Sequence, residues 1–234
     1  MKTKTSIGSK VPTLEFEIAA GAPEFLVAGV DEVGRGCLAG PVVSGAVILP
    51  ADLYAAPQWP AELHEVRDSK LLSPQQRERL APWIRSFALA WSVGEASVQE
   101  IDSLNIYHAA HLSMKRAVEG LKVQPQIALI DGNAVPKSLI SLGVKGQPLV
   151  KGDMRSVTIA CASILAKVHR DAILERYEAE YPGYGFGAHK GYSTPAHQRA
   201  LIEKGALSIH RTSFAPVAKV LHPQPAQKAQ PTFL

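Results

Sequence analysis

The sequence contains few cysteines and no long apolar run, and each absence excludes a class of protein. Only Cys37 and Cys161 occur among 234 residues, far apart in the chain. Two isolated cysteines provide neither a disulfide framework nor the repeated ligand spacing of a zinc site. No segment approaches the roughly 18 apolar residues of a membrane span, and residues 1–21 lack the apolar core of a signal peptide. We therefore expect a reduced, cytoplasmic protein with no membrane contact.

The composition is that of a globular protein with a small excess of positive charge. Hydrophobic residues make up 46% and charged residues 20%, so one large domain can bury a core. The net charge of +4 is a mild indication of a polyanionic partner. We predict a partly disordered extension over 1–22, one folded domain over 23–220, and a disordered Pro- and Gln-rich tail over 221–234. Within the extension, Leu14, Phe16 and Ile18 alternate as a short extra strand would.

One stretch, Phe25 to Gly36 (FLVAGVDEVGRG), combines a strand with two adjacent acids. The apolar run predicts a buried strand, and Asp31 and Glu32 stand at its end. Two carboxylates this close repel each other by several kcal/mol even at an effective dielectric constant of about 20. A divalent cation would offset that repulsion, and oxygen ligands suit Mg²⁺ or Mn²⁺.

Two later segments repeat this pattern of a strand followed by an acid and a glycine. Residues 126–130 predict a strand that ends at Asp131-Gly132, and residues 149–153 (LVKGD) predict a fifth short strand that ends at Asp153. In open α/β sheets, side chains at the carboxyl ends of neighbouring strands converge on one cleft. We therefore expect these acids to meet Asp31 and Glu32.

The other segments alternate between predicted strands and helices. Residues 42–50 (VVSGAVILP) are close enough to the first strand to pair with it antiparallel. Ser73 with Pro74 predicts a helix start, and Ser97 with Glu100 predicts a capping box. We also predict a surface loop over 51–64, a helix to about 87, a strand over 88–96, a helical stretch with a core face of Leu104, Tyr107, Met114, Ala117 and Leu121, a long helix over 156–181, and a short helix over 194–203.

Two glycine-containing segments have alternative interpretations. Gly34 and Gly36 allow backbone groups to approach a ligand, with Arg35 placed to meet phosphate or sugar oxygens; the alternative is a flexible turn with a solvated arginine. The loop over 184–194, YGFGAHKGYST, interleaves aromatic and cationic side chains that can stack on nucleotides, or it is a packing loop.

Taken together, these segments resemble the type 2 ribonucleases H, the family that includes bacterial ribonuclease HII. The resemblance runs from about residue 25 to Val217. The motifs that carry it are VDEVGRG, GPVV, DSK with LS, LNIYHA, IDGN, KGD, IACASILAKVHRD, HKGYSTPAH and HRTSFAPV. It implies an α/β protein with an RNase H-like fold, a mixed five-stranded sheet flanked by helices, and a C-terminal helical segment.

The resemblance also implies an activity. Members of the family cut the RNA strand of RNA–DNA hybrids and cut 5′ of single ribonucleotides embedded in duplex DNA, with two Mg²⁺ or Mn²⁺ ions, leaving 5′-phosphate and 3′-hydroxyl ends. Their metal-binding carboxylates map onto Asp31, Glu32, Asp131 and Asp153. Asp171 is the alternative to Asp153; we prefer Asp153 because Asp171 lies one turn beyond Lys167, where it suits a structural pair.

Further residues are assigned to substrate and partners by the same resemblance. Gly34, Arg35, Gly36 and Tyr192 would recognise the ribonucleotide. Lys70, Lys167 and Lys190 are candidates for holding phosphates, and Ser69 for donating a hydrogen bond. We expect a monomer.

The tail sequence Gln230 to Leu234 loosely resembles the peptides that bind the sliding clamp, although a plain disordered end is the alternative. Two competing functions remain at this point: another nuclease of the fold, such as a junction resolvase, and a catalytically silent duplex-binding module. Cleavage of a duplex with one ribonucleotide, but not of the all-DNA control, separates them.

Overall fold

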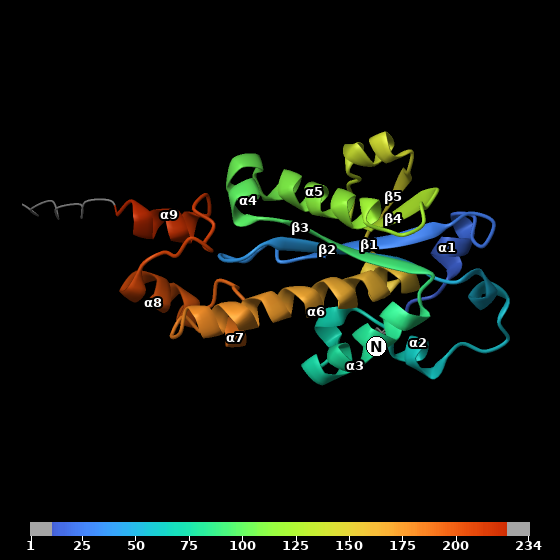
Figure 1. Ribbon diagram of the computed structural model, residues 1–234, viewed down its shortest axis with the longest axis horizontal. Helices are drawn as coiled ribbons and strands as arrows, with labels where there is room; N and C mark the ends of the chain where they lie inside the picture. The colour runs from blue at the N-terminus through green and yellow to red at the C-terminus, as the bar shows by residue number, and fades with distance from the viewer. Residues whose placement is uncertain (1–10, 224–234) are drawn as a thin grey trace, which may run out of the picture.

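The computed structural model describes residues 11–223 and is built around one mixed five-stranded sheet (Figure 1). The strand order is β3-β2-β1-β4-β5. The hairpin β1–β2 and the pair β2–β3 are antiparallel, whereas β4 lies parallel to β1 and β5 parallel to β4. This confirms the predicted fold class. The strands are β1 Val27–Val33, β2 Val42–Ile48, β3 Ala90–Ala96, β4 Ile127–Asp131 and β5 Lys145–Leu149.

Helices cover both faces of the sheet. In Figure 1, α5 lies over one face and α6 lies under the other, with α3 packed outside α6. The C-terminal helices form the predicted helical segment at one end. The helices are α1 Glu15–Ala19, α2 Ala61–Glu65, α3 Pro74–Phe87, α4 Val98–Leu104, α5 Ile106–Glu119, α6 Val157–Glu180, α7 Phe186–His189, α8 Pro195–Lys204 and α9 Ala215–Leu221, with 3-10 turns η1 Ala51–Ala55, η2 Ser69–Leu71, η3 Lys137–Leu142 and η4 Gly152–Met154.

Glycines in β1 and β2 let α6 lie close against the sheet. A Cβ atom on Gly29 would come within 2.3 Å of the Ile159 nitrogen, and one on Gly45 within 2.3 Å of the Ala162 carbonyl oxygen. Real Cβ atoms do not make such contacts, so α6 requires glycine at both positions. Because side chains alternate along a strand, Ala28 and Val30 lie on the opposite face of β1, where they pack in the core beneath α5.

Residues 11–22, the second half of the extension predicted to be partly disordered, belong to the fold. The predicted short strand is instead helix α1, where the N-cap Leu14 is buried and Ile18 is exposed, so the alternation does not mark one face of a strand. Glu17 is buried, and its Oε1 accepts hydrogen bonds from the Ser156 and Thr158 hydroxyls at 2.7 and 2.8 Å. Residues 1–10, the rest of the predicted extension, lie outside the described residues.

Local predictions succeed at helix starts and fail where backbone geometry changes abruptly. Ser73 caps α3 as predicted, in a capping box with Gln76, and the predicted capping box at Ser97 is present. The predicted loop over 51–64 contains η1 and most of α2. The predicted helical stretch is two helices, because Asn105 at φ 66° separates α4 from α5 and caps the second. Its predicted core face is therefore only partly correct: Met114 and Ala117 are buried, but Leu104 and Tyr107 are exposed.

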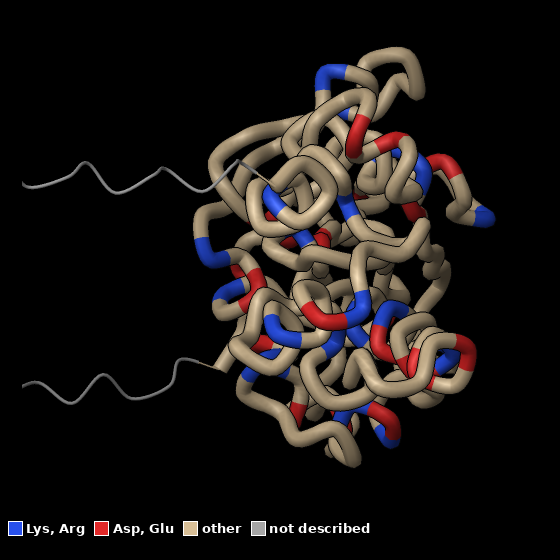
Figure 2. Tube along the Cα trace, turned by 90° about the vertical axis from the view of Figure 1, so that its left-hand side faces the viewer, with Lys and Arg blue, Asp and Glu red and all other residues tan. Residues whose placement is uncertain are grey.

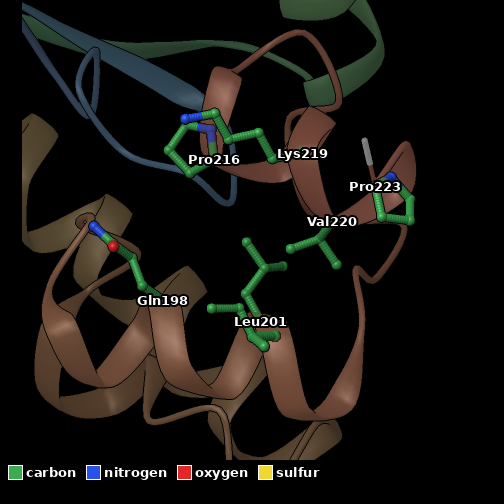
Figure 3. Close-up of a pocket in the computed structure, with 7 residues that line it drawn as sticks. Gln198, Leu201, Pro216, Lys219, Val220 and Pro223 are labelled. Atoms are coloured by element: carbon green, nitrogen blue, oxygen red, sulfur yellow. The ribbon is translucent and has the colours of Figure 1, made fainter. Parts of the chain in front are cut away.

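An open cavity of about 460 Å³ lies between α8 and α9 (Figure 3). Leu201, Ile202, Pro216, Val220 and Pro223 give it an apolar lining. No carboxylate lines this cavity, so it is not the place where the acidic residues meet. The predicted tail begins at 221, and its residues 224–234 lie outside the described part.

Charges of both signs are interspersed along the chain in the view of Figure 2. Several form pairs, such as Arg116 with Glu100 at 2.7 Å and Lys190 with Glu175 at 2.7 Å. Such pairs balance charge locally and leave the net charge of +4 unchanged. No helix among residues 11–223 is long and apolar enough to cross a membrane.

Candidate active site

Three acids predicted from separate segments meet at one end of the sheet. Asp31 and Asp131 each follow the paired residues Val30 and Ile130 in adjacent parallel strands, so their side chains lie on the same face. Asp153 arrives from η4, just after β5. One ligand oxygen from each of the three carboxylates lies within 4.8 Å of the other two.

Asp153 reaches the cluster by a different path from the one predicted. The predicted strand over 149–153 is wrong in position, because β5 ends at Leu149 and the chain then turns sharply through Lys151 at φ 56° into η4. The Gly152 N–H donates a hydrogen bond to Asp131 Oδ1 at 2.6 Å. This bond ties the turn that carries Asp153 directly to the neighbouring carboxylate.

Burial and mutual repulsion raise the pKa values in the cluster. Asp31 is only 5% exposed, and its pKa is raised well above its usual range by burial and then by the charges of Glu32, Asp131 and Asp153. Burial and Asp131 also raise the pKa of Asp153. Such repulsion between buried oxygen ligands is what a hard divalent cation relieves, so the donor set fits one.

Glu32 is separated from this group by strand alternation. Its side chain leaves β1 on the face opposite Asp31 and forms an ion pair with Arg35 Nη1 at 3.2 Å. Burial raises the pKa of Glu32 while the Arg35 charge opposes the change. Its backbone N–H donates to Asp31 Oδ1 at 2.7 Å. The structure thus brings three of the four predicted carboxylates together and places the fourth beside them, paired with a cation.

The predicted polar residues of the 69–70 segment also lie at this site. Lys70 Nζ is 3.7 Å from Asp153 Oδ2, and the nearby acids raise its pKa against the effect of burial. Ser69 Oγ is 2.9 Å from Ser163 Oγ, and the Ser163 side chain hydrogen-bonds the Asp31 carboxylate. Ser163 is therefore a site residue that the sequence did not assign.

The other two predicted lysines are ion-paired elsewhere. Lys167 and Lys190 line a second cavity of about 460 Å³ bounded by α3, α6 and α7. Lys167 Nζ is 2.5 Å from Asp171 Oδ1, and Arg77 Nη2 is 3.6 Å from Asp171 Oδ2. Asp171 thus has the structural pairing that the sequence predicted for it.

The Gly34–Gly36 turn and Tyr192 lie side by side. Cys37 and Tyr192 form an isolated antiparallel bridge, which joins the two segments directly. The Tyr192 side chain remains 39% exposed, so the ring is available to a ligand. The predicted ribonucleotide-binding residues, which come from two separate motifs, are therefore neighbours in space.

Two buried arginines that the sequence left unassigned hold these segments together. Arg170 donates to the carbonyls of Pro41, Ala39 and Lys190 at 2.8 to 3.0 Å. Arg211 Nη1 donates to the Arg35 carbonyl at 2.9 Å, and its other nitrogens donate to Gly40 and Pro41. Both side chains are fully buried. An arginine in a helix or a polar loop is usually expected to be exposed, so the sequence gave no signal for these two.

The two glycines of the turn have different roles. Gly34 lies at φ 95°, and a Cβ atom there would fall 2.2 Å from Arg170 Nε. Gly36 has no heavy atom within 4 Å of its Cβ position. Gly34 therefore makes room for the buried arginine, and only Gly36 leaves the open space that the sequence predicted for a ligand.

Comparisons with known proteins give the family. The family model described as Ribonuclease HII matches residues 28–217. Ribonuclease HII of Vibrio cholerae serotype O1 is 48% identical over 216 residues, covering 91% of this chain and 98% of the relative.

Two solved structures are also similar to this chain. Ribonuclease H2 from Pyrococcus horikoshii OT3 has a TM-score of 0.69 at 28% identity, covering 83% of this chain and 96% of that one. RNase HII of Archaeoglobus fulgidus, solved as a complex with PCNA, has a TM-score of 0.64 at 28% identity, covering 81% and 95%. The chain belongs to the ribonuclease HII family and is a metal-dependent endoribonuclease.

Proposed function

We propose that this enzyme cuts the RNA strand of RNA–DNA hybrids and cuts 5′ of single ribonucleotides in duplex DNA by two-metal catalysis, leaving 5′-phosphate and 3′-hydroxyl ends. The observation that carries the proposal is the cluster of Asp31, Asp131 and Asp153. Only two residues, Glu32 and Val33, separate Asp31 from Gly34, where the proposed ribonucleotide-reading turn begins. A cutting site and a reading site are thus adjacent.

Each polar residue around the cluster has a part in the proposed reaction. Asp31, Asp131 and Asp153 would hold the cations, and Glu32, which the structure pairs with Arg35, is the fourth carboxylate that the family resemblance assigns to them. A bound Mg²⁺ or Mn²⁺ would supply Lewis-acid chemistry to the attacking water and the leaving oxygen. Ser69 and Lys70 face the phosphate that is cut.

Recognition of the ribonucleotide falls to the turn and the tyrosine. The 2′-hydroxyl both donates and accepts hydrogen bonds, and it is the group that distinguishes RNA from DNA at one position. Backbone groups at Gly34, Arg35 and Gly36 can meet it because no side chain fills the space at Gly36. The Tyr192 ring packs on the next sugar and rejects a second 2′-hydroxyl there.

The phosphate roles of Lys167 and Lys190 remain predictions. Each is paired with an acid, Asp171 or Glu175, so binding a phosphate requires exchange of that partner. Their shared cavity lies beside α6, the helix that also carries Ser163. A duplex that extends past the cut site along α6 would meet it.

One cleavage assay tests the proposal. Three end-labelled duplexes of the same sequence, with one ribonucleotide, with an all-RNA strand and with DNA only, are incubated with Mg²⁺ or Mn²⁺. We expect cleavage of the first two, a cut 5′ of the single ribonucleotide, and products that a ligase can rejoin because they carry 5′-phosphate and 3′-hydroxyl ends. Cleavage of the all-DNA duplex, or none of the single-ribonucleotide duplex, contradicts the proposal.

We also propose that the tail binds the sliding clamp. The proposal is supported by the sequence Gln230 to Leu234, and an archaeal RNase HII is named as a complex with PCNA. A labelled peptide of residues 221–234 is titrated against the clamp. We expect binding that Phe233→Ala removes; no binding at high micromolar concentration contradicts the idea without affecting the nuclease assignment.

A further inference from the structure

Three histidines lie together behind the Tyr192 backbone. His197 and His210 are fully buried, and the His189 ring stacks on His197 with centroids 4.2 Å apart. Tyr184 and Phe186 pack against His210. None of the three touches the carboxylate cluster, and the proposed reaction uses none of them.

Backbone partners determine where each imidazole carries its proton. The Leu207 N–H donates to His210 Nδ1 at 2.9 Å, so the proton of neutral His210 is on Nε2. That N–H points at His197 Nε2, 3.1 Å away, which must accept it. His197 therefore carries its proton on Nδ1, 2.9 Å from the Tyr192 carbonyl oxygen. The result is a single directed chain of hydrogen bonds from Leu207 to Tyr192.

The surroundings favour the neutral form of both rings. Burial and the neighbouring histidines lower the pKa of His210 to about 4, and burial also lowers the pKa of His197. The ionisable groups that face the two rings are His189 and the Tyr184 phenol, neither of which supplies a negative charge near neutral pH. Arg211 follows His210 in the chain and is itself a buried cation. The chain of hydrogen bonds is therefore complete under ordinary assay conditions.

We propose that His197 and His210 are positioning residues that fix the Tyr192 peptide, and through it the ring that reads the ribonucleotide. The inference rests on the proposed function of Tyr192. Its geometric basis is the Tyr192 carbonyl, which accepts from His197 Nδ1 and from the Thr194 N–H at 2.8 Å, while the Tyr192 N–H donates to the His189 carbonyl at 2.9 Å. The peptide is held on both sides, but the side chain is left free to contact substrate.

Two conservative variants of His197 separate a positioning role from a packing role. The Asn side-chain nitrogen occupies the place of Nδ1, so His197→Asn keeps the donor to the Tyr192 carbonyl. The Gln amide reaches the place of Nε2, so His197→Gln keeps a partner for His210 but loses the Nδ1 donor. Gln also fills the buried space better than Asn. If His197 acts through packing, Gln should be the milder substitution. If it positions Tyr192, Asn should be the milder one.

The readout is KM and kcat on the duplex with one ribonucleotide, together with the unfolding temperature of each variant. We expect His197→Gln to raise KM about fivefold with kcat unchanged, as the loss of one hydrogen bond implies, and His197→Asn, which keeps the donor to Tyr192 but loses the acceptor for His210, to raise KM less. In a Tyr192→Ala background the Gln change should add nothing further. Equal effects of Gln and Asn, or a Gln effect that persists without the tyrosine ring, overturn the inference.

The parent enzyme provides a second test that needs no variant. Nitrogen-15 NMR of histidine-labelled protein at neutral pH reports the tautomer of each ring, and we expect Nδ1–H for His197 and Nε2–H for His210. The opposite tautomers overturn the inference. A Tyr192→Ala variant that cleaves like the parent removes the tyrosine from the proposed function and overturns the inference with it. An impaired Tyr192→Ala beside an unimpaired His197→Gln overturns the inference alone.

Discussion

Replacing Asp31 with asparagine should abolish metal-dependent cleavage and yet stabilise the metal-free protein. The side chain is buried, carries a repelling negative charge, and accepts the Glu32 N–H through Oδ1. Asparagine retains that acceptor and a similar volume. The substitution therefore removes charge while it preserves packing and the backbone hydrogen bond.

The distances in the cluster limit the size of the effect. Two unit charges 4.8 Å apart interact by about 3 kcal/mol at an effective dielectric constant of 20. The full repulsion is not recovered, because the raised pKa of Asp31 already relieves part of it. We expect a gain of about 2 kcal/mol in the free energy of unfolding without metal, or about 4 to 8 °C in a domain of this size.

The stability that Asp31→Asn gains should be larger at neutral pH than at low pH. A carboxyl whose folded pKa is raised binds its proton more tightly in the folded state, so it contributes stability at low pH that is lost as pH rises above 3.8 through the folded value. Asp31→Asn lacks this loss. The difference in unfolding temperature between variant and parent should therefore shrink as pH falls toward 3.8 and be largest near neutrality.

Thermal unfolding with EDTA and with excess Mn²⁺ is the measurement. The variant should be the more stable protein in EDTA and the less stable one in Mn²⁺, because only the parent gains fully from metal binding. Asp52→Asn, at an exposed acid in η1, is the matched control and should change neither value. A variant less stable than the parent in EDTA refutes the reasoning about repulsion, and one that cleaves normally removes Asp31 from the site.

Three further predictions concern the supporting structure. Gly34→Ala should lower the unfolding temperature by about 4 °C or more, through positive-φ strain and the clash with Arg170, whereas Gly36→Ala should leave it unchanged; equal shifts contradict the separate roles of the two glycines. His210 binds a proton less readily when folded, so it should cost stability as pH falls from 6.5 toward about 4, by about 3 kcal/mol, and urea unfolding of parent and His210→Asn should diverge over that range; parallel curves contradict it. Asp171→Asn leaves two cations without their carboxylate and should lower the unfolding temperature while the stabilisation by Mn²⁺ persists; loss of that stabilisation would make it a metal ligand.

Patterns confined to one segment predicted much of the molecule. A capping box depends on four consecutive residues, and a hairpin on two neighbouring strands, so both could be read directly. The three acids could be placed together because each follows a strand whose carboxyl end lies at the same end of the sheet. Asp153 shows the limit of this reasoning: its strand was predicted four residues too late, since the turn at Lys151 depends on contacts with Asp131 that local sequence does not show.

Residues whose role lies in burial could not be predicted from the sequence. Arg170 and Arg211 look like surface residues in a charged helix and a polar loop, but their guanidinium groups bind carbonyls from segments more than 100 residues away. His197 and His210 are thirteen positions apart, and they meet only because the chain turns back after α8. Asn105 at φ 66° divides a helix that periodicity extended through it, because apolar spacing does not report a positive φ.

Helix α6 links the carboxylate cluster to the proposed ribonucleotide-binding turn. Ser163 hydrogen-bonds Asp31, and Arg170, seven residues further on, binds the turn after Gly34 and the segment before Tyr192. Seven residues are about two helical turns, so both side chains leave the same face of α6, about 10 Å apart along its axis. Because an α-helix packed this closely on a sheet neither stretches nor rotates easily, one rigid element sets the spacing between the carboxylates and the groups proposed to bind the ribonucleotide. Gly29 and Gly45, which let α6 lie against the sheet, therefore help to set the position of the site.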